Sequence, residues 1–88
     1  MPSDLPAIPI GAAVAIDWND AAAESMWCDA SDIAAKPSRV RSIGYLVKFN
    51  KQVIVIAADV DPKTPAKGEV NRHMTIPTGM VVKIKRMR

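Results

Sequence analysis

One stretch decides the fold: Gly44-Tyr45-Leu46-Val47-Lys48-Phe49-Asn50-Lys51-Gln52-Val53-Ile54-Val55-Ile56. It predicts two apolar strands joined by a short polar turn at Asn50-Lys51. A glycine inside a strand weakens it unless the strand bends or another backbone approaches closely, so Gly44 predicts a curved barrel strand. The second strand, 52–59, is apolar on both faces. This predicts burial on both sides, either at the centre of a sheet or at a subunit contact.

The first strand of this pair, expected over 40–50, has two alternating faces. One face carries Ile43, Tyr45, Val47 and Phe49, and the other carries Ser42, Gly44, Leu46 and Lys48. We expect the first face to line the core, because two aliphatic residues accompany the two aromatic ones. The alternative for the aromatic pair is an exposed platform on which nucleic-acid bases stack.

Three further strands are predicted, at 14–18, 73–76 and 80–88, together with an exposed loop at 61–69 that holds two prolines and a glycine. Pro77-Thr78-Gly79 predicts a tight turn in which Gly79 is free to adopt a positive φ. In the last strand we expect two alternating faces, made of Met80, Val82 and Ile84 on one side and of Val81, Lys83 and Lys85 on the other.

The region 19–38 predicts a short helical insertion after the first strand, with turns at 21–27 and 32–36 that Pro37 ends. Asp29 or Ser31 is suited to cap the second turn. We expect Trp18 and Trp27 to fasten this insertion to the rest of the domain. Residues 1–9 hold three prolines and predict a flexible arm, which leaves 10–88 as a single domain.

The chain has 88 residues, of which 49% are apolar and 5% aromatic. Domains of this size often gain stability by burying a further face against copies of themselves, so we expect a homo-oligomer. A single cysteine, Cys28, excludes an internal disulfide framework and indicates a reducing compartment. No apolar run approaches the roughly 20 residues of a membrane span. We therefore expect a cytoplasmic protein that does not contact membranes.

Charge is divided unevenly along the chain. Residues 1–35 hold six acidic residues and no Lys or Arg, whereas residues 36–88 hold all twelve basic residues against three acidic ones. A basic C-terminal surface would attract phosphates and steer anionic ligands. Alternatively, the acidic part docks on the basic part, within one chain or between chains. Ordinary solvated charge on strand faces is the third interpretation.

The residues that carry catalytic chemistry elsewhere lack partners in this sequence. His73 is the sole histidine, so it cannot anchor a metal site unless carboxylates assist, and we expect no metal site. We also expect no cofactor. Cys28 has no neighbouring base and is expected to be a small buried apolar residue. Asp59 and Asp61 are two residues apart and would suit acid–base chemistry, but their place before a proline-rich loop favours a turn-forming role. We expect no enzymatic activity.

Two resemblances follow from these motifs. Gly44, Leu46, Phe49, Asn50, Val53 and Val55 have the spacing of the Sm-like fold, which includes the bacterial Sm-like RNA chaperone. Ile76-Pro77-Thr78-Gly79 departs from the RNA-contacting closing turn of that family, so its RNA contacts are not carried over. The sequence also resembles short uncharacterised phage and prophage proteins. That resemblance rests on Val14-x-Ile16-x-Trp18, Trp27, Gly44-Tyr45-Leu46-Val47 and Thr75-Ile76-Pro77-x-Gly79-x-Val81.

Together these features predict an all-β protein: a small five-stranded Sm-like or SH3-like barrel with a short helical insertion. We expect a non-enzymatic, phage-type protein that binds an anionic, nucleotide-like ligand, either RNA or DNA or a small nucleotide signal of host defence. The alternative is a protein–protein interaction module, such as an inhibitor of a host protein or a minor virion component. The candidate ligand-binding residues are Arg39, Arg41, Lys48, Lys51, Arg72, His73, Lys83 and Lys85.

Overall fold

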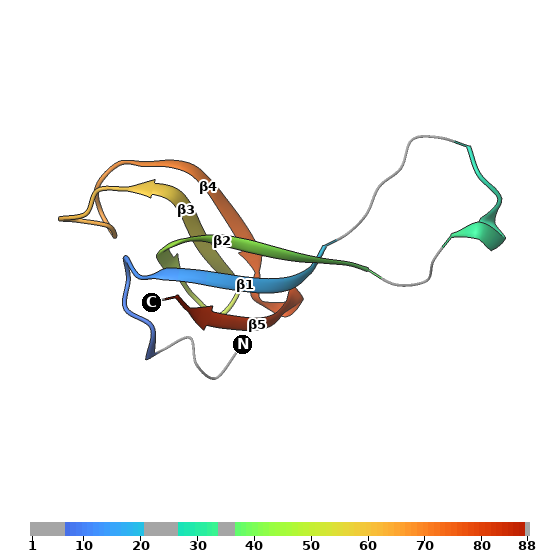
Figure 1. Cartoon of the computed structure of the whole chain (residues 1–88), viewed down its shortest axis with the longest axis horizontal. Helices are drawn as coiled ribbons and strands as arrows, with labels where there is room; N and C mark the ends of the chain where they lie inside the picture. The colour runs from blue at the N-terminus through green and yellow to red at the C-terminus, as the bar shows by residue number, and fades with distance from the viewer. Residues whose placement is uncertain (1–6, 21–26, 34–36, 88) are drawn as a thin grey trace.

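The computed structural model describes residues 7–20, 27–33 and 37–87. They contain five strands, all antiparallel, in one curved sheet of order β4-β3-β2-β1-β5 (Figure 1). The last strand therefore pairs with the first. This confirms the predicted small all-β, barrel-like fold. The strands are β1 (Ala13–Asp20), β2 (Ser38–Phe49), β3 (Val53–Val60), β4 (Val70–Pro77) and β5 (Val81–Arg86).

The core lies inside the curved sheet, and every strand contributes to it. Aliphatic side chains at alternate positions of β1 and β3 point inward, as a period of two requires. Each large aliphatic side chain that is fully buried contributes about 1.5–3 kcal/mol. The buried cluster consists of Ile8, Val14, Ile16, Leu46, Ile54, Ile56, Ile76 and Ile84.

The predicted inner face of β2 is wrong for its first half. Ile43 and Tyr45 are 60% and 40% exposed, whereas Leu46 is completely buried. The pairing with β3 shifts between Leu46 and Lys48, so Val47 is an extra residue that reverses the alternation. Phe49 then packs against the core, as predicted.

Gly44 has the role that its place in the strand predicts. A Cβ atom at Gly44 would lie 3.0 Å from the carbonyl oxygen of Ala57 in β3. Because real Cβ atoms hardly ever come so close to a backbone oxygen, only glycine lets the two strands approach in this way.

The predicted faces of β5 also need correction. The pairing of β1 with β5 shifts between Asp17 and Trp18, where Val82 is the extra residue. Val81 and Ile84 consequently face the core, while Val82 is about half exposed. Lys83 and Lys85 remain on the outer face, opposite Asp17 and Ala15.

Polar side chains fix the two connections at one end of the barrel. The Asn50 side-chain oxygen accepts hydrogen bonds from the backbone N–H groups of Gln52 and Val53, which is the local turn chemistry expected of asparagine. Between β4 and β5 lies a 3-10 turn, η3 (Thr78–Met80). The buried Thr78 hydroxyl donates to the Lys51 carbonyl at 2.6 Å. The predicted positive φ of Gly79 is wrong: the glycine with a positive φ among those described is Gly11.

The segment before β1 packs on the barrel. Ile8, which lies within the predicted arm, is buried in the core, so the domain includes this residue. Gly11 donates its backbone N–H to the Leu46 carbonyl at 2.7 Å, and the Leu46 N–H donates to Ala12. The φ of Gly11 is 93°, and a Cβ atom there would lie 2.8 Å from Pro65 Cγ.

Replacing Gly11 with alanine is expected to lower the free energy of unfolding by about 1–3 kcal/mol, because a side chain at this φ is strained. The clash with Pro65 adds to the cost. Urea unfolding of the Gly11→Ala variant measures the effect. Gly79→Ala is the matched control, since nothing lies within 4 Å of a Cβ atom there. Equal stability of the two variants would contradict the described conformation of Gly11.

Between β1 and β2, the described residues 27–33 lie beyond one end of the barrel (Figure 1). They contain a 3-10 turn, η2 (Ala30–Asp32), preceded by Asp29 without a side-chain cap. Most of the predicted helical turns, at 21–26 and 34–36, lie outside the described residues. The predictions for Trp27 and Cys28 are wrong, because both are exposed. Trp18, in contrast, packs against the core and donates its indole N–H to Ser42 at 3.0 Å.

No helix among residues 7–20, 27–33 and 37–87 is long and apolar enough to cross a membrane.

Candidate anion-binding face

Four of the predicted basic residues lie on the outer face of β2, β1 and β5. Side chains that are directly opposite in antiparallel strands point to the same side of the sheet. Asp17 lies opposite Arg41 of β2 and Lys83 of β5, which forms one row across the three strands. In a second row Ala15 lies between Ile43 and Lys85, and Arg39 lies opposite Asn19. We call this surface the basic face and define it by Arg39, Arg41, Ile43, Lys83 and Lys85, with Ala15 and Asp17 between them. Arg86 lies opposite the buried Val14, at the end of β5, and is not part of these rows.

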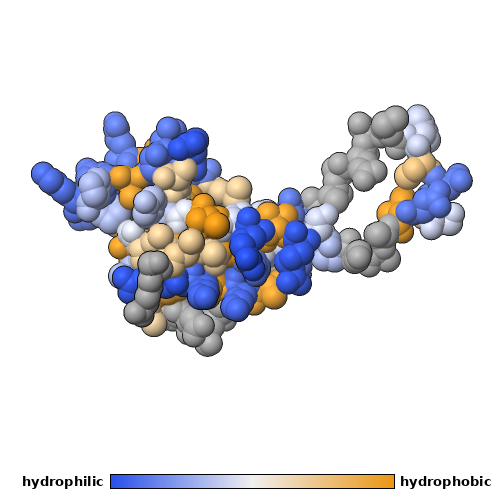
Figure 2. Space-filling model, viewed as in Figure 1, coloured by the Kyte–Doolittle hydropathy of each residue, from blue (hydrophilic) through white to orange (hydrophobic). Residues whose placement is uncertain are grey.

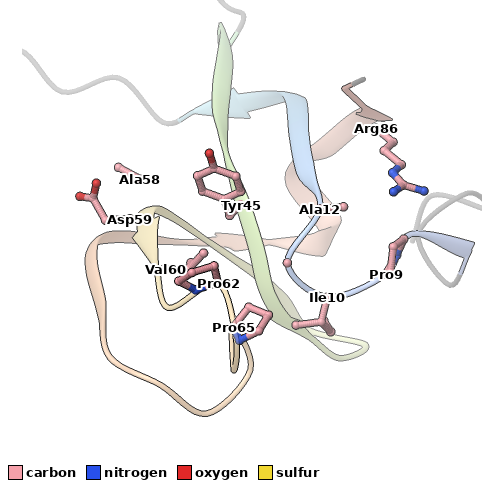
Figure 3. A pocket seen from close by; sticks show the side chains of 11 residues that line it. Pro9, Ile10, Ala12, Tyr45, Ala58, Asp59, Val60, Pro62, Pro65 and Arg86 are labelled. Atoms are coloured by element: carbon pink, nitrogen blue, oxygen red, sulfur yellow. The ribbon is translucent and has the colours of Figure 1, made fainter.

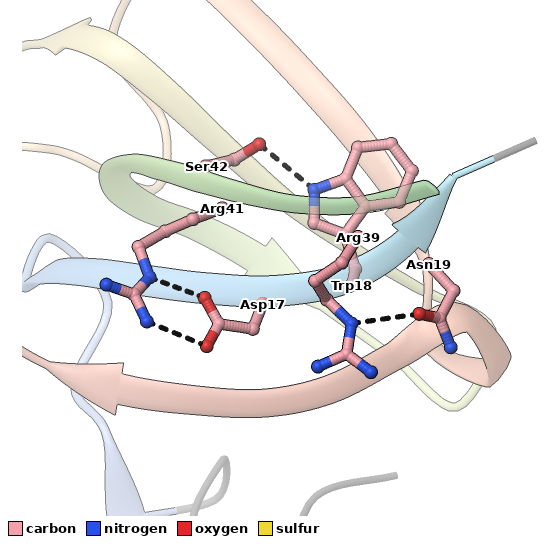
Figure 4. A network of polar contacts seen from close by, with 6 residues as sticks. All are labelled: Asp17, Trp18, Asn19, Arg39, Arg41 and Ser42. Carbon is pink, nitrogen blue, oxygen red and sulfur yellow. Dashed lines mark hydrogen bonds and ion pairs between the residues drawn. The ribbon is translucent and has the colours of Figure 1, made fainter. Parts of the chain in front are cut away.

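Asp17 and Arg41 form a two-pronged ion pair (Figure 4). Arg41 Nε donates to Asp17 Oδ1 at 2.6 Å and Nη2 donates to Oδ2 at 3.0 Å. These hydrogen bonds lower the pKa of Asp17 against a smaller opposing effect of desolvation, and the charges of Arg41, Arg39 and Lys83 lower it further. Arg39 donates to the neutral Asn19 side chain at 3.0 Å. Asp17 therefore orients Arg41 and compensates part of the positive charge of the face.

The ion pair gives a testable pH dependence. Because folding lowers the pKa of Asp17, its contribution to stability is complete above the ordinary value of 3.8 and is lost as the pH falls through the lower pKa of the folded protein. We expect Asp17→Asn to be less stable than the wild type at pH 7. This difference should shrink below pH 3.8. Urea midpoints of both proteins across the acid range measure it, and a difference independent of pH would contradict the ion pair.

The basic face surrounds an open hollow of about 660 Å³. Ala15, which has the smallest side chain of its row, lies between the longer side chains of Ile43 and Lys85. The lining consists of Ala15, Asp17, Arg41, Ile43, Lys83, Lys85, Arg86 and Met87. In Figure 2 hydrophilic and hydrophobic side chains lie side by side on the visible face of the barrel. The hollow thus combines several cations with exposed apolar groups.

The other predicted ligand-binding residues lie elsewhere. Lys48 and Lys51 are exposed near the connection between β2 and β3, and Arg72 and His73 lie on β4, at the other edge of the sheet order. Arg72 adopts a positive φ of 54° and pairs with Asp59 at 3.0 Å. Among the described residues the ion pairs are this one and Arg41–Asp17, so Lys83 and Lys85 lack carboxylate partners there.

Asp59 and Asp61, the two carboxylates weighed for acid–base chemistry, have different structural surroundings. Asp61 accepts hydrogen bonds from the Lys63 N–H at 2.9 Å and from the Thr64 hydroxyl at 3.0 Å. These bonds lower its pKa and shape the loop, as predicted for a turn-forming residue. Asp59 instead pairs with Arg72, so each carboxylate already has a local partner.

Sequence reasoning missed five residues of the hollow: Ala15, Asp17, Ile43, Arg86 and Met87. Asp17 had a usable signal, since it alternates with the buried Val14 and Ile16 and so belongs to the outer face of its strand. The placement of Ile43 depends on the extra residue Val47, which a regular period of two cannot reveal. Arg86 lies in the last strand, as predicted, but it was not among the predicted ligand-binding residues.

A second hollow, of about 590 Å³, lies between the N-terminal segment, β2, the end of β3 and the proline-rich loop. Tyr45, Ile10, Pro62 and Pro65 contribute apolar surface to it (Figure 3). It holds one cationic and one acidic side chain, Arg86 and Asp59. Its charges are balanced, so it lacks the bias toward anions of the basic face.

Within the part of the chain that the structure describes, no group of three or more His, Cys, Asp or Glu side chains could hold a metal ion. The chain matches no protein-family model, no curated protein and no solved structure.

Proposed function

We propose that the protein is a small, non-enzymatic binding protein whose basic face takes an anionic, nucleotide-like ligand. One observation carries the proposal: four cations from two strands, Arg41, Lys83, Lys85 and Arg86, line one hollow. Two of them, Lys83 and Lys85, have no carboxylate partner among the described residues. Ammonium groups of this kind attract phosphate oxygens as point charges.

The remaining groups of the hollow favour a nucleotide-like ligand over a simple inorganic anion. Ile43 is 60% exposed and Met87 is 43% exposed, which offers apolar surface to the flat side of a base. Met is well suited to such contacts because its side chain is flexible and polarizable. The Asp17 carboxylate, held by Arg41, can accept hydrogen bonds from an amino or hydroxyl group. The hollow thus offers a complementary group to each part of a nucleotide: cations to the phosphate, apolar side chains to the base and the Asp17 carboxylate to its polar edge.

The same proposal has four further parts. The protein has no catalytic activity, derives from a phage, is located in the cytoplasm and forms a homo-oligomer. The local partners of Asp59 and Asp61 support the first of these. The resemblance in sequence to phage and prophage proteins supports the second. A small nucleic-acid-binding or nucleotide-sequestering protein would have all four properties. RNA, DNA and a small nucleotide signal each present a phosphate and a base to the basic face.

A salt titration tests the proposed function. We expect the wild-type protein to bind a labelled single-stranded oligonucleotide or a cyclic dinucleotide at low salt. For a single strand, the logarithm of the affinity should fall with the logarithm of the salt concentration by about 0.7 for each phosphate contacted. Fluorescence anisotropy measures the oligonucleotide and calorimetry the dinucleotide. Absence of binding to both probes at low salt would refute the proposal.

A second candidate function, a protein–protein interaction module, is favoured by the excursion between β1 and β2. Its Trp27 is fully exposed and Ile33 is 63% exposed. Trp is among the residues that contribute most to binding at protein interfaces. Two large apolar side chains exposed beyond the end of their own barrel are suited to contact another protein chain.

A further inference from the structure

We propose that the segment Trp27–Ile33 docks into the basic face of a second copy of this chain, forming a reciprocal dimer. The segment reads Trp27-Cys28-Asp29-Ala30-Ser31-Asp32-Ile33 and carries two carboxylates and no cation. This proposal does not depend on a nucleotide ligand, although it uses the same surface. It is instead a specific form of the second candidate function.

The segment is exposed, and no partner for it is found among the described residues of its own chain. Trp27 has its full side-chain surface in solvent, and η2 contains no buried residue. In Figure 1 the segment lies well beyond the end of the barrel, along the 52 Å axis of the chain. Burial of an aromatic side chain of this size is strongly favourable in free energy. We therefore expect Trp27 to be covered by a partner at an interface.

Charge complementarity identifies the occupant of the basic face. Asp29 and Asp32 bring two negative charges, and Lys83 and Lys85 supply two cations without a carboxylate partner among the described residues. Complementary charges of this kind orient two surfaces and exclude wrong pairings. The acidic N-terminal part and the basic C-terminal part of the sequence then meet between chains.

Apolar complementarity supports the same arrangement. The hollow has exposed Ile43 and Met87 on its lining and the small Ala15 between the outer strands. Trp27 and Ile33 lie at the two ends of the segment. These two apolar side chains can pack against Ile43 and Met87 in the hollow. A two-fold symmetric dimer would bury two such contacts, because each chain offers both a segment and a face.

The unique cysteine permits a direct test. Cys28 is exposed beside Trp27 and serves as a natural probe in one chain. The second chain, distinguished by a tag, carries Cys28→Ala with Ile43→Cys in the hollow. Its matched control carries Cys28→Ala with Thr75→Cys, at an exposed position of β4 away from the basic face. The two chains are mixed, oxidised mildly without any nucleotide, and separated on a non-reducing gel.

We expect at least tenfold more mixed disulfide with Ile43→Cys than with Thr75→Cys. Adding Lys83→Glu and Lys85→Glu to the Ile43→Cys chain should remove this preference. Equal yields at the two positions would overturn the proposal, as would a sedimentation mass that remains monomeric at all concentrations. So would a chain with both Cys28 and Ile43→Cys that forms only an internal disulfide.

The outcomes separate this inference from the proposed anion binding. Mixed disulfide without any binding of the oligonucleotide or dinucleotide would refute the ligand and support the dimer. Salt-dependent binding of a probe without the preferred disulfide would refute the dimer alone. If both contacts form, adding the oligonucleotide should lower the yield of mixed disulfide, since the two partners compete for Lys83 and Lys85.

Discussion

Replacing Leu46 with alanine is expected to lower the free energy of unfolding by about 2–5 kcal/mol, because Leu46 is completely buried at the centre of the core. The lost methyl groups leave a cavity between β2 and β3 that a packed interior fills only in part. For a domain of this size such a loss is a large share of the total stability. Chemical unfolding measures the loss, monitored by tryptophan fluorescence, in which Trp18 is the tryptophan packed against the core.

Ile43→Ala is the matched control in the same strand. Ile43 is 60% exposed, so we expect its replacement to change stability by no more than about 0.5 kcal/mol. A regular alternation of β2 predicts the reverse order, with Ile43 inside and Leu46 outside. The pair of variants therefore tests the extra residue Val47 as well as the burial of Leu46. A larger loss for Ile43→Ala than for Leu46→Ala would refute the described pairing of β2 with β3.

The largest expected effect on binding follows from removing two charges of the basic face. A variant with Lys83→Ala and Lys85→Ala should bind the oligonucleotide about tenfold more weakly or worse, which corresponds to about 1.4 kcal/mol. Its salt dependence should also become shallower by about 1–2 in the logarithmic slope, since phosphate contacts are lost. Both side chains are exposed, so the variant should fold normally, as circular dichroism would show.

The control for this variant removes the same net charge elsewhere. Lys48→Ala with Lys51→Ala changes two exposed lysines near the connection between β2 and β3. We expect this control to weaken binding only slightly, through the general charge of the protein. Equal losses for the two double variants would mean that binding depends on net charge, and that the basic face is not a site.

The position of the five strands along the chain could be predicted, because several local features of the sequence indicate the same strand boundaries. Alternating apolar residues, the asparagine turn after Phe49 and the proline-rich loop at 61–69 each mark a boundary that the structure confirms. The direction of the side chains in β2 and β5 could not be predicted, because each strand contains one extra residue, Val47 in β2 and Val82 in β5. One inserted residue reverses all positions on one side of it, and its cause lies in pairing with another strand rather than in local sequence.

The candidate site was predictable in part for the same reason. Lys83 and Lys85 were expected on the outer face of the last strand, and their predicted separation from Ile84 holds. The convergence of Arg41 with these lysines depends on sheet order, because β1 lies between β2 and β5. Sequence alone did not establish that Arg72 lies on the other edge strand, nor that it pairs with Asp59. Long-range pairing decided which of the basic residues became neighbours.

The pairing of β5 with β1 has a consequence for the order in which the site is made during translation. β1 is synthesised early, but one of its edges has no partner until β5 has been synthesised. Contacts between residues so distant in sequence form late, because a long loop must first close. Lys83 and Lys85 therefore complete the basic face after the core strands have paired. A nascent chain that lacks β5 has no complete basic face, so the proposed binding of phosphate requires that β5 has been synthesised and has paired with β1.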